Sequence, residues 1–163
     1  MLHRIDGDLH IEQVSLNEIK DSYGTPCYVY SEQAIQTAYR AFDEAFEGHP
    51  HDIRYAVKAN SNLAVLQTLA QLGSGFDIVS GGELTRVLAA GGDASKVVFS
   101  GVGKQDWEIE YALESDIGCI NVESASELHR IARICEANNR RAPISIRIRS
   151  EEHTSELQSH LNL

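Results

Sequence analysis

Lys58 is the residue whose position points most directly to chemistry. It lies in the stretch Tyr55-Ala56-Val57-Lys58-Ala59-Asn60, where an apolar run ends and a short polar segment begins. A lysine at the end of a buried strand can be desolvated, which favours the neutral amine and frees it to form a Schiff base. A solvated lysine at a strand end is the alternative, and position alone does not exclude it. Whether the lysine belongs to a site depends on what the neighbouring elements bring to the same place.

Short apolar runs alternate with helical patterns along residues 53–148. We expect strands over 53–58, 76–79, 97–100, 119–122 and 144–148, and helices over 63–72, 82–90, 106–114 and from 125 onward. The strand ends are almost evenly spaced, which indicates a repeated strand–helix unit with parallel pairing. Periodicity does not choose between a doubly wound sheet and a (β/α)8 barrel. Since a full barrel needs roughly 250 residues, the chain would form only part of one.

The region before residue 53 has a different pattern. Residues 9–16 alternate between polar and apolar, and Gly24-Thr25-Pro26 precedes a β-rich run at 27–30. Ser31 then has the side chain of a helix N-cap. The residues Ile35, Ala38, Tyr39, Phe42 and Phe46 would share one face of that helix.

Composition narrows the classes of partner. The chain has 163 residues and a formal net charge of −10, which opposes binding to nucleic acid or to an anionic membrane surface. We see neither a membrane span nor a secretory signal, and we expect a cytoplasmic protein that binds small molecules. The three cysteines are scattered, and His49-Pro50-His51 lacks a third ligand nearby, so no metal site is expected.

Five segments taken together resemble the beginning of the bacterial diaminopimelate decarboxylases. They are GTPCYVYS, IRYAVKANSN, GSGFDIVSGGEL, VVFSGVGK and INVESASEL, in this order and spacing. The resemblance covers residues 9–148 and implies a family dependent on pyridoxal 5'-phosphate (PLP). It also implies an α/β fold, namely the first five strands of a TIM-like (β/α)8 barrel of the alanine-racemase type. Residues 1–26 would belong to a separate β domain that the chain lacks, and residues 27–148 would form the partial PLP-binding barrel.

The resemblance also assigns roles to individual residues. Lys58 would be the catalytic lysine that carries the cofactor as a Schiff base. Asp77 and Glu83 match an acidic pair near that lysine, and Arg147 matches an arginine on the cofactor side of its strand. Each has a simpler alternative: Asp77 bonded to a neighbouring turn, Glu83 favoured by the helix dipole, and Arg147 at the surface.

The function implied is decarboxylation of meso-2,6-diaminopimelate to L-lysine and carbon dioxide, in lysine biosynthesis. The full-length protein would be a homodimer with an amino-acid substrate. The alternatives are a decarboxylase of ornithine, arginine or carboxynorspermidine, an alanine racemase, and a non-enzymatic PLP-binding barrel protein. After VKAN, alanine racemases have an aromatic-Gly-His-Gly run where this chain has Ser61-Asn62-Leu63.

Residues 149–163 depart from the family pattern. The string RSEEHTSELQSH resembles the translation of a common short-read sequencing adapter, so we interpret this segment as non-native and exclude it from the fold. The family's phosphate cradle and the acid at the pyridine nitrogen would lie beyond Ile148. We therefore expect the chain alone to be inactive. We also expect it to fold poorly, because two parallel edges and an apolar interior face would stay open.

Overall fold

The structure is a computed structural model of the chain, and it describes residues 2–148. The first part contains β1 (Leu2–Ile5), β2 (Asp8–Ile11), β3 (Val14–Ser15), α1 (Leu16–Tyr23) and α2 (Glu32–Ala45). The second part contains β4 (Arg54–Ala56), η1 (Val57–Ala59), α3 (Leu63–Gln71), β5 (Gly75–Ile78), α4 (Gly81–Ala89), η2 (Ala94–Lys96), β6 (Val97–Phe99), α5 (Asp106–Glu114), β7 (Cys119–Val122), α6 (Ala125–Ala137) and β8 (Ile144–Ile146). The interpretation of residues 149–163 falls outside the described residues.

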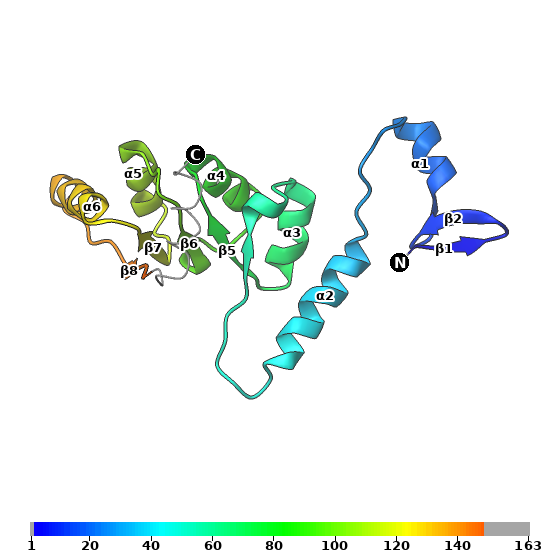
Figure 1. Cartoon of the computed structure of the whole chain (residues 1–163), viewed down its shortest axis with the longest axis horizontal. Coiled ribbons are helices and arrows are strands. Elements are labelled where there is room, and N and C mark those ends of the chain that lie inside the picture. Colours follow the sequence, from blue (N-terminus) through cyan, green and yellow to red (C-terminus); the bar gives the residue numbers. More distant parts are fainter. Residues whose placement is uncertain (1, 149–163) are drawn as a thin grey trace, which may run out of the picture.

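The second part forms a five-stranded sheet, the large sheet, in the order β4-β5-β6-β7-β8. Every neighbouring pair is parallel, and each strand is joined to the next through at least one helix. Figure 1 shows the helices α3 to α6 alongside these strands. Strand order that follows chain order, with one helix per crossover, is the arrangement of consecutive units of a (β/α)8 barrel. The predicted α/β fold with the first five barrel strands is confirmed.

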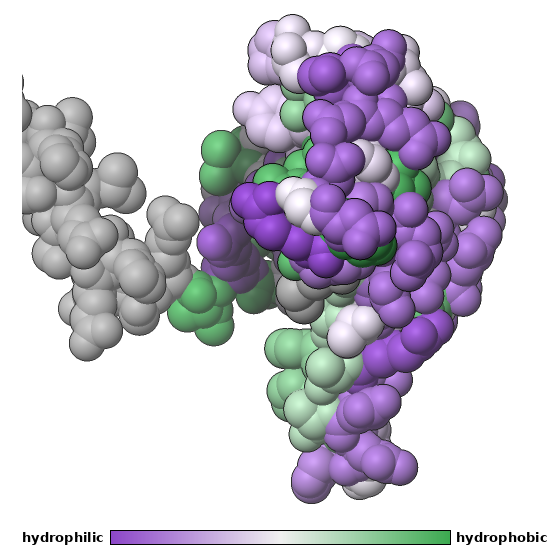
Figure 2. Space-filling model, turned by 90° about the vertical axis from the view of Figure 1, so that its right-hand side faces the viewer, coloured by the Kyte–Doolittle hydropathy of each residue, from purple (hydrophilic) through white to green (hydrophobic). Residues whose placement is uncertain are grey.

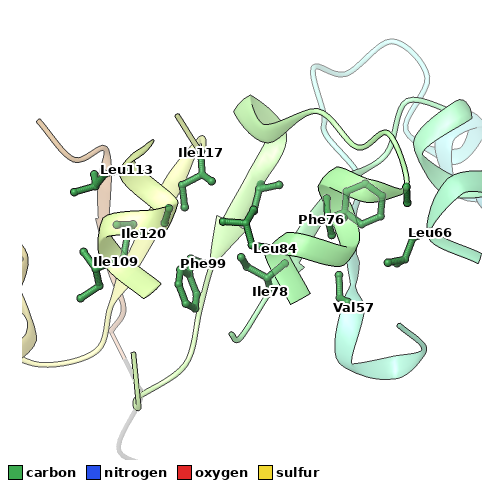
Figure 3. Close-up of a cluster of buried hydrophobic side chains, with 14 of the residues drawn as sticks. Val57, Leu66, Phe76, Ile78, Leu84, Phe99, Ile109, Leu113, Ile117 and Ile120 are labelled. Carbon is green, nitrogen blue, oxygen red and sulfur yellow. The ribbon is translucent and has the colours of Figure 1, made fainter. Parts of the chain in front are cut away.

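The core lies between the large sheet and its helices. Phe76 and Ile78 on β5 and Phe99 on β6 are fully buried, and they pack in one cluster with the buried helix residues Leu66 and Leu84. Figure 3 shows these side chains between the strands and the helices. Since alternate strand residues point to opposite faces, this one face of each strand carries the hydrophobic burial.

The opposite face of the large sheet, called the uncovered face, is mostly polar. It carries Asp77, Val98, Cys119, Asn121 and Ser145, which are matched in register across β5 to β8 and lie half-buried or exposed. The expected apolar interior face is therefore mixed in this part of the sheet, with Val98 and Cys119 beside the polar side chains of Asp77, Asn121 and Ser145. The sequence shows why, because the residues between the buried apolar positions are mostly small or polar.

The two predicted open edges are present in the described residues, since β4 and β8 each pair on one side only. At the β8 edge, Ile144 and Ile146 are 42% and 67% exposed, because no further element covers them there. At the β4 edge, a groove of about 670 Å³ separates the strand from α2 and α3. Apolar side chains are therefore exposed at the β8 edge and an open groove lies along the β4 edge, while other exposed apolar residues, such as Val102 and Trp107, lie away from both edges.

The first part of the chain forms an antiparallel sheet of β1, β2 and β3, followed by α1. In Figure 1 this unit lies beyond the N-terminal end of α2, away from the large sheet. Glu12 connects this unit to the start of α2, because its Oε1 accepts hydrogen bonds from Ser31 Oγ at 2.6 Å and Gln33 N at 2.9 Å. These two bonds lower the pKa of Glu12. The predicted Ser31 N-cap is confirmed by its bond from Ala34 N.

The β-rich run at 27–30 is not a strand in the structure. Its Tyr28 is 92% exposed, and no other strand of the described chain lies against it. β-propensity alone does not form a strand, because a strand needs a partner for its backbone hydrogen bonds. On α6, Ile131 and Ile134 are buried, whereas Ala132 between them is exposed.

Most of the visible surface in Figure 2 is hydrophilic, with hydrophobic residues exposed in patches. Within residues 2–148, no helix combines the length and the apolar content required to cross a membrane. The same residues contain no cluster of three or more histidine, cysteine or acidic side chains arranged to hold a metal ion.

Candidate active site

The candidate residues gather where the parallel strands end, an edge of the large sheet that we call the carboxyl edge. Lys58 follows β4, Asp77 lies near the end of β5, and Arg147 follows β8 directly. Glu83 lies in the first turn of α4, just after β5. Because all strands run the same way, their carboxyl ends share this edge, which is where active sites of parallel α/β folds form. Lys58 and Arg147 follow the first and the last strand of the order, and within residues 2–148 no hydrogen bond or ion pair joins any two of the four residues.

Lys58 lies in the 3-10 turn η1, two residues beyond the end of β4. The sequence placed it in the strand itself, so that boundary is wrong by two residues. The Tyr55 hydroxyl donates to the Asn60 carbonyl at 3.4 Å and draws the chain into the turn. Lys58 is exposed, and in the described part of the chain its amine has no hydrogen-bond or ion-pair partner. The structure therefore shows a solvated lysine and not the desolvated one, with an amine that is accessible.

The polar residues that follow Lys58 are used to build the next loop. Asn60 Oδ1 accepts from Asn62 N at 3.0 Å, and Asn62 Oδ1 accepts from Ala64 N at 2.9 Å as the N-cap of α3. Arg86 on α4 also donates to the Ser61 carbonyl at 3.3 Å. The turn that carries Lys58 is thus fixed from both sides by contacts within the described chain.

Asp77 takes part in a line of hydrogen bonds across the uncovered face. Ser100, which follows β6 directly, donates from Oγ to Asp77 Oδ1 at 2.5 Å. Asn121 on β7 donates from Nδ2 to Ser100 Oγ at 3.0 Å. The three residues come from three adjacent strands, so the contacts depend on the parallel register of the sheet.

The carboxylate of Glu83 closes a capping box at the start of α4. Its Oε2 accepts from Val79 N at 2.7 Å, while Ser80 Oγ accepts from Glu83 N at 3.2 Å. The same Ser-x-x-Glu arrangement opens α6, where Glu127 Oε2 accepts from Glu123 N at 2.7 Å. This repetition favours a structural role for Glu83 in the described chain. Its role near the cofactor stays a prediction.

Arg147 forms an ion pair with Glu123, with Arg147 Nη1 3.1 Å from Glu123 Oε1. The same oxygen accepts from Gly101 N at 3.1 Å. Partial burial opposes ionisation of Glu123, but the Gly101 N–H and the Arg147 guanidinium outweigh it and lower the pKa of this carboxyl. The charge of Arg147 is therefore paired within the chain. Its place on the cofactor side of the strand stays a prediction.

Lys104 is a buried cation beneath the same edge. Its side chain has no exposed surface, and its Nζ lies 2.9 Å from Glu127 Oε1. It also donates at 2.7 Å to the carbonyls of Gly101 and Asn121. Three donors therefore meet three acceptors, the condition under which a lysine can be buried as a cation. The bonds tie the loop after β6 to β7 and α6.

Backbone N–H groups at the turns of this edge are bound by glutamate carboxylates. Besides Val79 and Glu123, Gly81 N donates to Glu108 Oε1 at 2.8 Å, and Gln105 N donates to Glu108 Oε2 at 2.8 Å. Helix N-termini often bind phosphate through such donors. Since carboxylates already occupy these groups, the turns after β5, β6 and β7 are poor candidates for holding a phosphate.

The sequence did not point to Ser100, Lys104, Asn121 or Glu123 as members of the site. The signal for Ser100 and Asn121 was their place at strand ends, at the same level as Asp77. The burial of Lys104 was also missed. A lysine inside an otherwise small and polar loop gives no sign of the acceptors that surround it.

A parallel sheet of successive strand–helix units, with an accessible lysine amine at the carboxyl edge of its first strand, fits the first part of a PLP-binding (β/α)8 barrel. The comparisons identify the family. Residues 32–161 match the family described as pyridoxal-dependent decarboxylase, pyridoxal binding domain. The chain belongs to this family.

Individual relatives agree with this assignment. Diaminopimelate decarboxylase of Vibrio cholerae is 58% identical over 143 residues, which cover 88% of this chain and 34% of that protein. The crystal structure of diaminopimelate decarboxylase from Helicobacter pylori, complexed with L-lysine, has a TM-score of 0.78 and 47% identity, covering 81% of this chain and 34% of that one. Lysine/ornithine decarboxylase from Vibrio vulnificus shares the fold, with a TM-score of 0.71 at 23% identity, over 82% of this chain and 35% of that one. The chain spans about a third of the length of the curated relatives it matches.

Proposed function

We propose that this chain is the lysine-bearing part of an enzyme that decarboxylates meso-2,6-diaminopimelate to L-lysine and carbon dioxide. The observation that carries the proposal is the free Lys58 amine at the carboxyl edge, in a chain that belongs to the pyridoxal-dependent decarboxylases. The 58% identity to a diaminopimelate decarboxylase, against 23% to a lysine/ornithine decarboxylase, supports diaminopimelate as the substrate.

The residues present fit PLP in part. Lys58 offers an amine for covalent attachment, and Asp77 offers a carboxylate on the polar uncovered face. Arg147 and Glu83 lie close to the edge but are engaged with Glu123 and Val79. In this proposal, Lys58 and Asp77 face the cofactor. Arg147 contributes a guanidinium that is paired with Glu123, and Glu83 holds the turn after β5 through its bond from Val79 N. We expect the phosphate contacts to come from outside residues 2–148.

Bound PLP supplies an electron sink for the bond that breaks in decarboxylation. The chain's own contribution is positional. Lys58 holds the cofactor until a substrate amine displaces it, and the loop bonds of Asn60 and Asn62 keep Lys58 at the edge. The wider expectations are a homodimer, a cytoplasmic location and the assignment of residues 1–26 to a separate β domain, and they also stay predictions.

The first experiment tests attachment in the chain itself. PLP is added to the 163-residue protein, the adduct is reduced with borohydride, and labelled peptides are mapped by mass spectrometry. We expect the label on Lys58 and its loss in Lys58→Ala, with Lys96→Ala as the matched control. Label spread evenly over the lysines, or unchanged in Lys58→Ala, would contradict the assignment of the cofactor lysine.

The second experiment tests the reaction. A chimera in which residues 1–148 replace the matching third of the Vibrio cholerae relative is assayed for carbon dioxide release from diaminopimelate, ornithine and arginine. We expect release from diaminopimelate only, its loss in Lys58→Ala, and none from the 163-residue chain alone. Preference for ornithine or arginine would favour the alternative decarboxylases. A folded chimera that binds PLP and releases no carbon dioxide would favour a non-enzymatic barrel.

A further inference from the structure

Asp77, Ser100 and Asn121 form one line of hydrogen bonds with a fixed direction. The Asn121 amide nitrogen carries only donors, so Ser100 Oγ must accept in their 3.0 Å contact. The single hydroxyl proton of Ser100 is then left for Asp77 Oδ1, at 2.5 Å. The line therefore ends on a carboxylate oxygen and orients that carboxylate.

The second oxygen of Asp77 is left for another partner. Within residues 2–148, Oδ2 makes no hydrogen bond or ion pair. Asp77 is half-buried on the uncovered face, away from the hydrophobic core. A carboxylate with one oxygen fixed and the other open is arranged to present negative charge in one direction.

Lys58 follows the neighbouring strand, β4, at the same edge. Asp77 pairs in register with Ala56, and Lys58 follows Ala56 by two residues. When Lys58 takes up the cofactor, its nitrogen bonds twice to the aldehyde carbon, and its two hydrogens leave with the aldehyde oxygen as water. The nitrogen then takes a proton from solvent and becomes positive. An oriented carboxylate on the adjacent strand stabilises that charge.

We propose that Ser100 and Asn121 are positioning residues that act through Asp77 on the covalent attachment of the cofactor at Lys58. This inference rests on the proposed function. The bland alternative is that the three side chains only satisfy one another's polar atoms in the sheet. The positioning role and this alternative differ in one respect. If the line positions Asp77, Asn121 can influence cofactor attachment only through the Ser100 hydroxyl.

The test measures the PLP concentration that half-saturates borohydride-trapped labelling of Lys58 in the full 163-residue chain. Ser100→Ala removes the hydroxyl, and we expect it to raise this concentration about tenfold, the effect of losing one charge-assisted hydrogen bond. Ser100→Thr keeps the hydroxyl and should restore labelling to within about twofold of the parent chain. Asn121→Leu should weaken labelling in the parent chain but add almost nothing in the Ser100→Ala background. Circular dichroism of each variant monitors folding.

Each outcome is decisive. A parent chain that does not label at Lys58 contradicts the proposed function, whereas equal labelling of the parent and Ser100→Ala contradicts only this inference. Additive effects of Ser100→Ala and Asn121→Leu, or failure of Ser100→Thr to rescue, would show that the line is merely structural. If Ser100→Ala does not fold, Asn121→Leu in the parent chain decides alone, and unchanged labelling there overturns the inference.

Discussion

Removal of the buried Lys104 charge should be among the most destabilising single changes in the large sheet. In Lys104→Met the apolar stem is kept, but the ammonium that serves Glu127 and the carbonyls of Gly101 and Asn121 is lost. Glu127, whose side chain is 8% exposed, keeps only its capping contacts and is left as a buried, unpaired charge. Breaking a buried ion pair from one side costs about 3–5 kcal/mol. We expect the free energy of unfolding to fall by that amount.

The assay is urea unfolding followed by circular dichroism at neutral pH. The loss should correspond to a midpoint of thermal unfolding lower by roughly 10 °C. Lys96→Met is the matched control, because Lys96 Nζ also donates to a carbonyl, Gly73 O at 3.0 Å, but from an exposed position. This control should change the free energy of unfolding by only about 0.5 kcal/mol.

A double variant identifies the cause of the loss. Glu127→Gln in the Lys104→Met background removes the unpaired charge and keeps an oxygen for the capping contact with Glu123 N. We expect it to recover about 1–2 kcal/mol, since the cost lies mainly in the uncompensated carboxylate. If Lys104→Met cost no more than the Lys96 control, or if the double variant were less stable than Lys104→Met, the reasoning from buried charge would be refuted.

Two further predictions concern acid stability and a close backbone approach. The pKa of Glu123 is lowered in the folded chain, so its ionised carboxylate contributes to stability above its ordinary pKa of 4.5. This contribution is lost as the pH falls below 4.5, and the urea midpoint should drop there. The drop should be smaller in Glu123→Gln. An equal drop in that variant would assign the effect to other carboxyls. Gly118→Ala should lower the free energy of unfolding by about 1–3 kcal/mol, because the new methyl group would meet the Ser95 carbonyl oxygen. Gly82→Ala should raise it by about 0.5–1 kcal/mol, because the nearest neighbour of its methyl group would be Ser80 Oγ at 3.8 Å. Similar results for the two glycines would contradict the steric argument.

The repeated unit was predictable because it depends on local patterns. The buried strands alternate with helices, and two of these helices begin at a Ser-x-x-Glu sequence, with Ser80 and Ser124 as the N-caps. The position of Lys58 was predictable to within a turn for the same reason. The run at 27–30 failed because strand formation depends on a partner, and a single sequence does not show whether a partner is present.

The contacts between strands were not predictable. The Ser100 bond to Asp77 joins residues on neighbouring strands, and Lys104 meets acceptors from three separate segments. These contacts depend on which residues the parallel register places side by side. The polarity of the uncovered face was present in the sequence, but it becomes informative only when the buried face is known.

Lys58 is held by contacts from nearby residues, whereas the other groups of the proposed site come from more distant parts of the protein. This difference is why cofactor attachment and decarboxylation are tested separately. Lys58 is fixed by Tyr55, Asn60 and Asn62, which all lie within a few residues of it, and by Arg86 from the adjacent helix. Tyr55 and Asn60 also line the groove at the open β4 edge. The backbone donors at the next turns are bound by carboxylates of the chain, so they are not available to the phosphate of a cofactor. In the proposed function, attachment at Lys58 draws on contacts within residues 2–148, whereas we expect tight cofactor binding and decarboxylation to depend on residues outside that range.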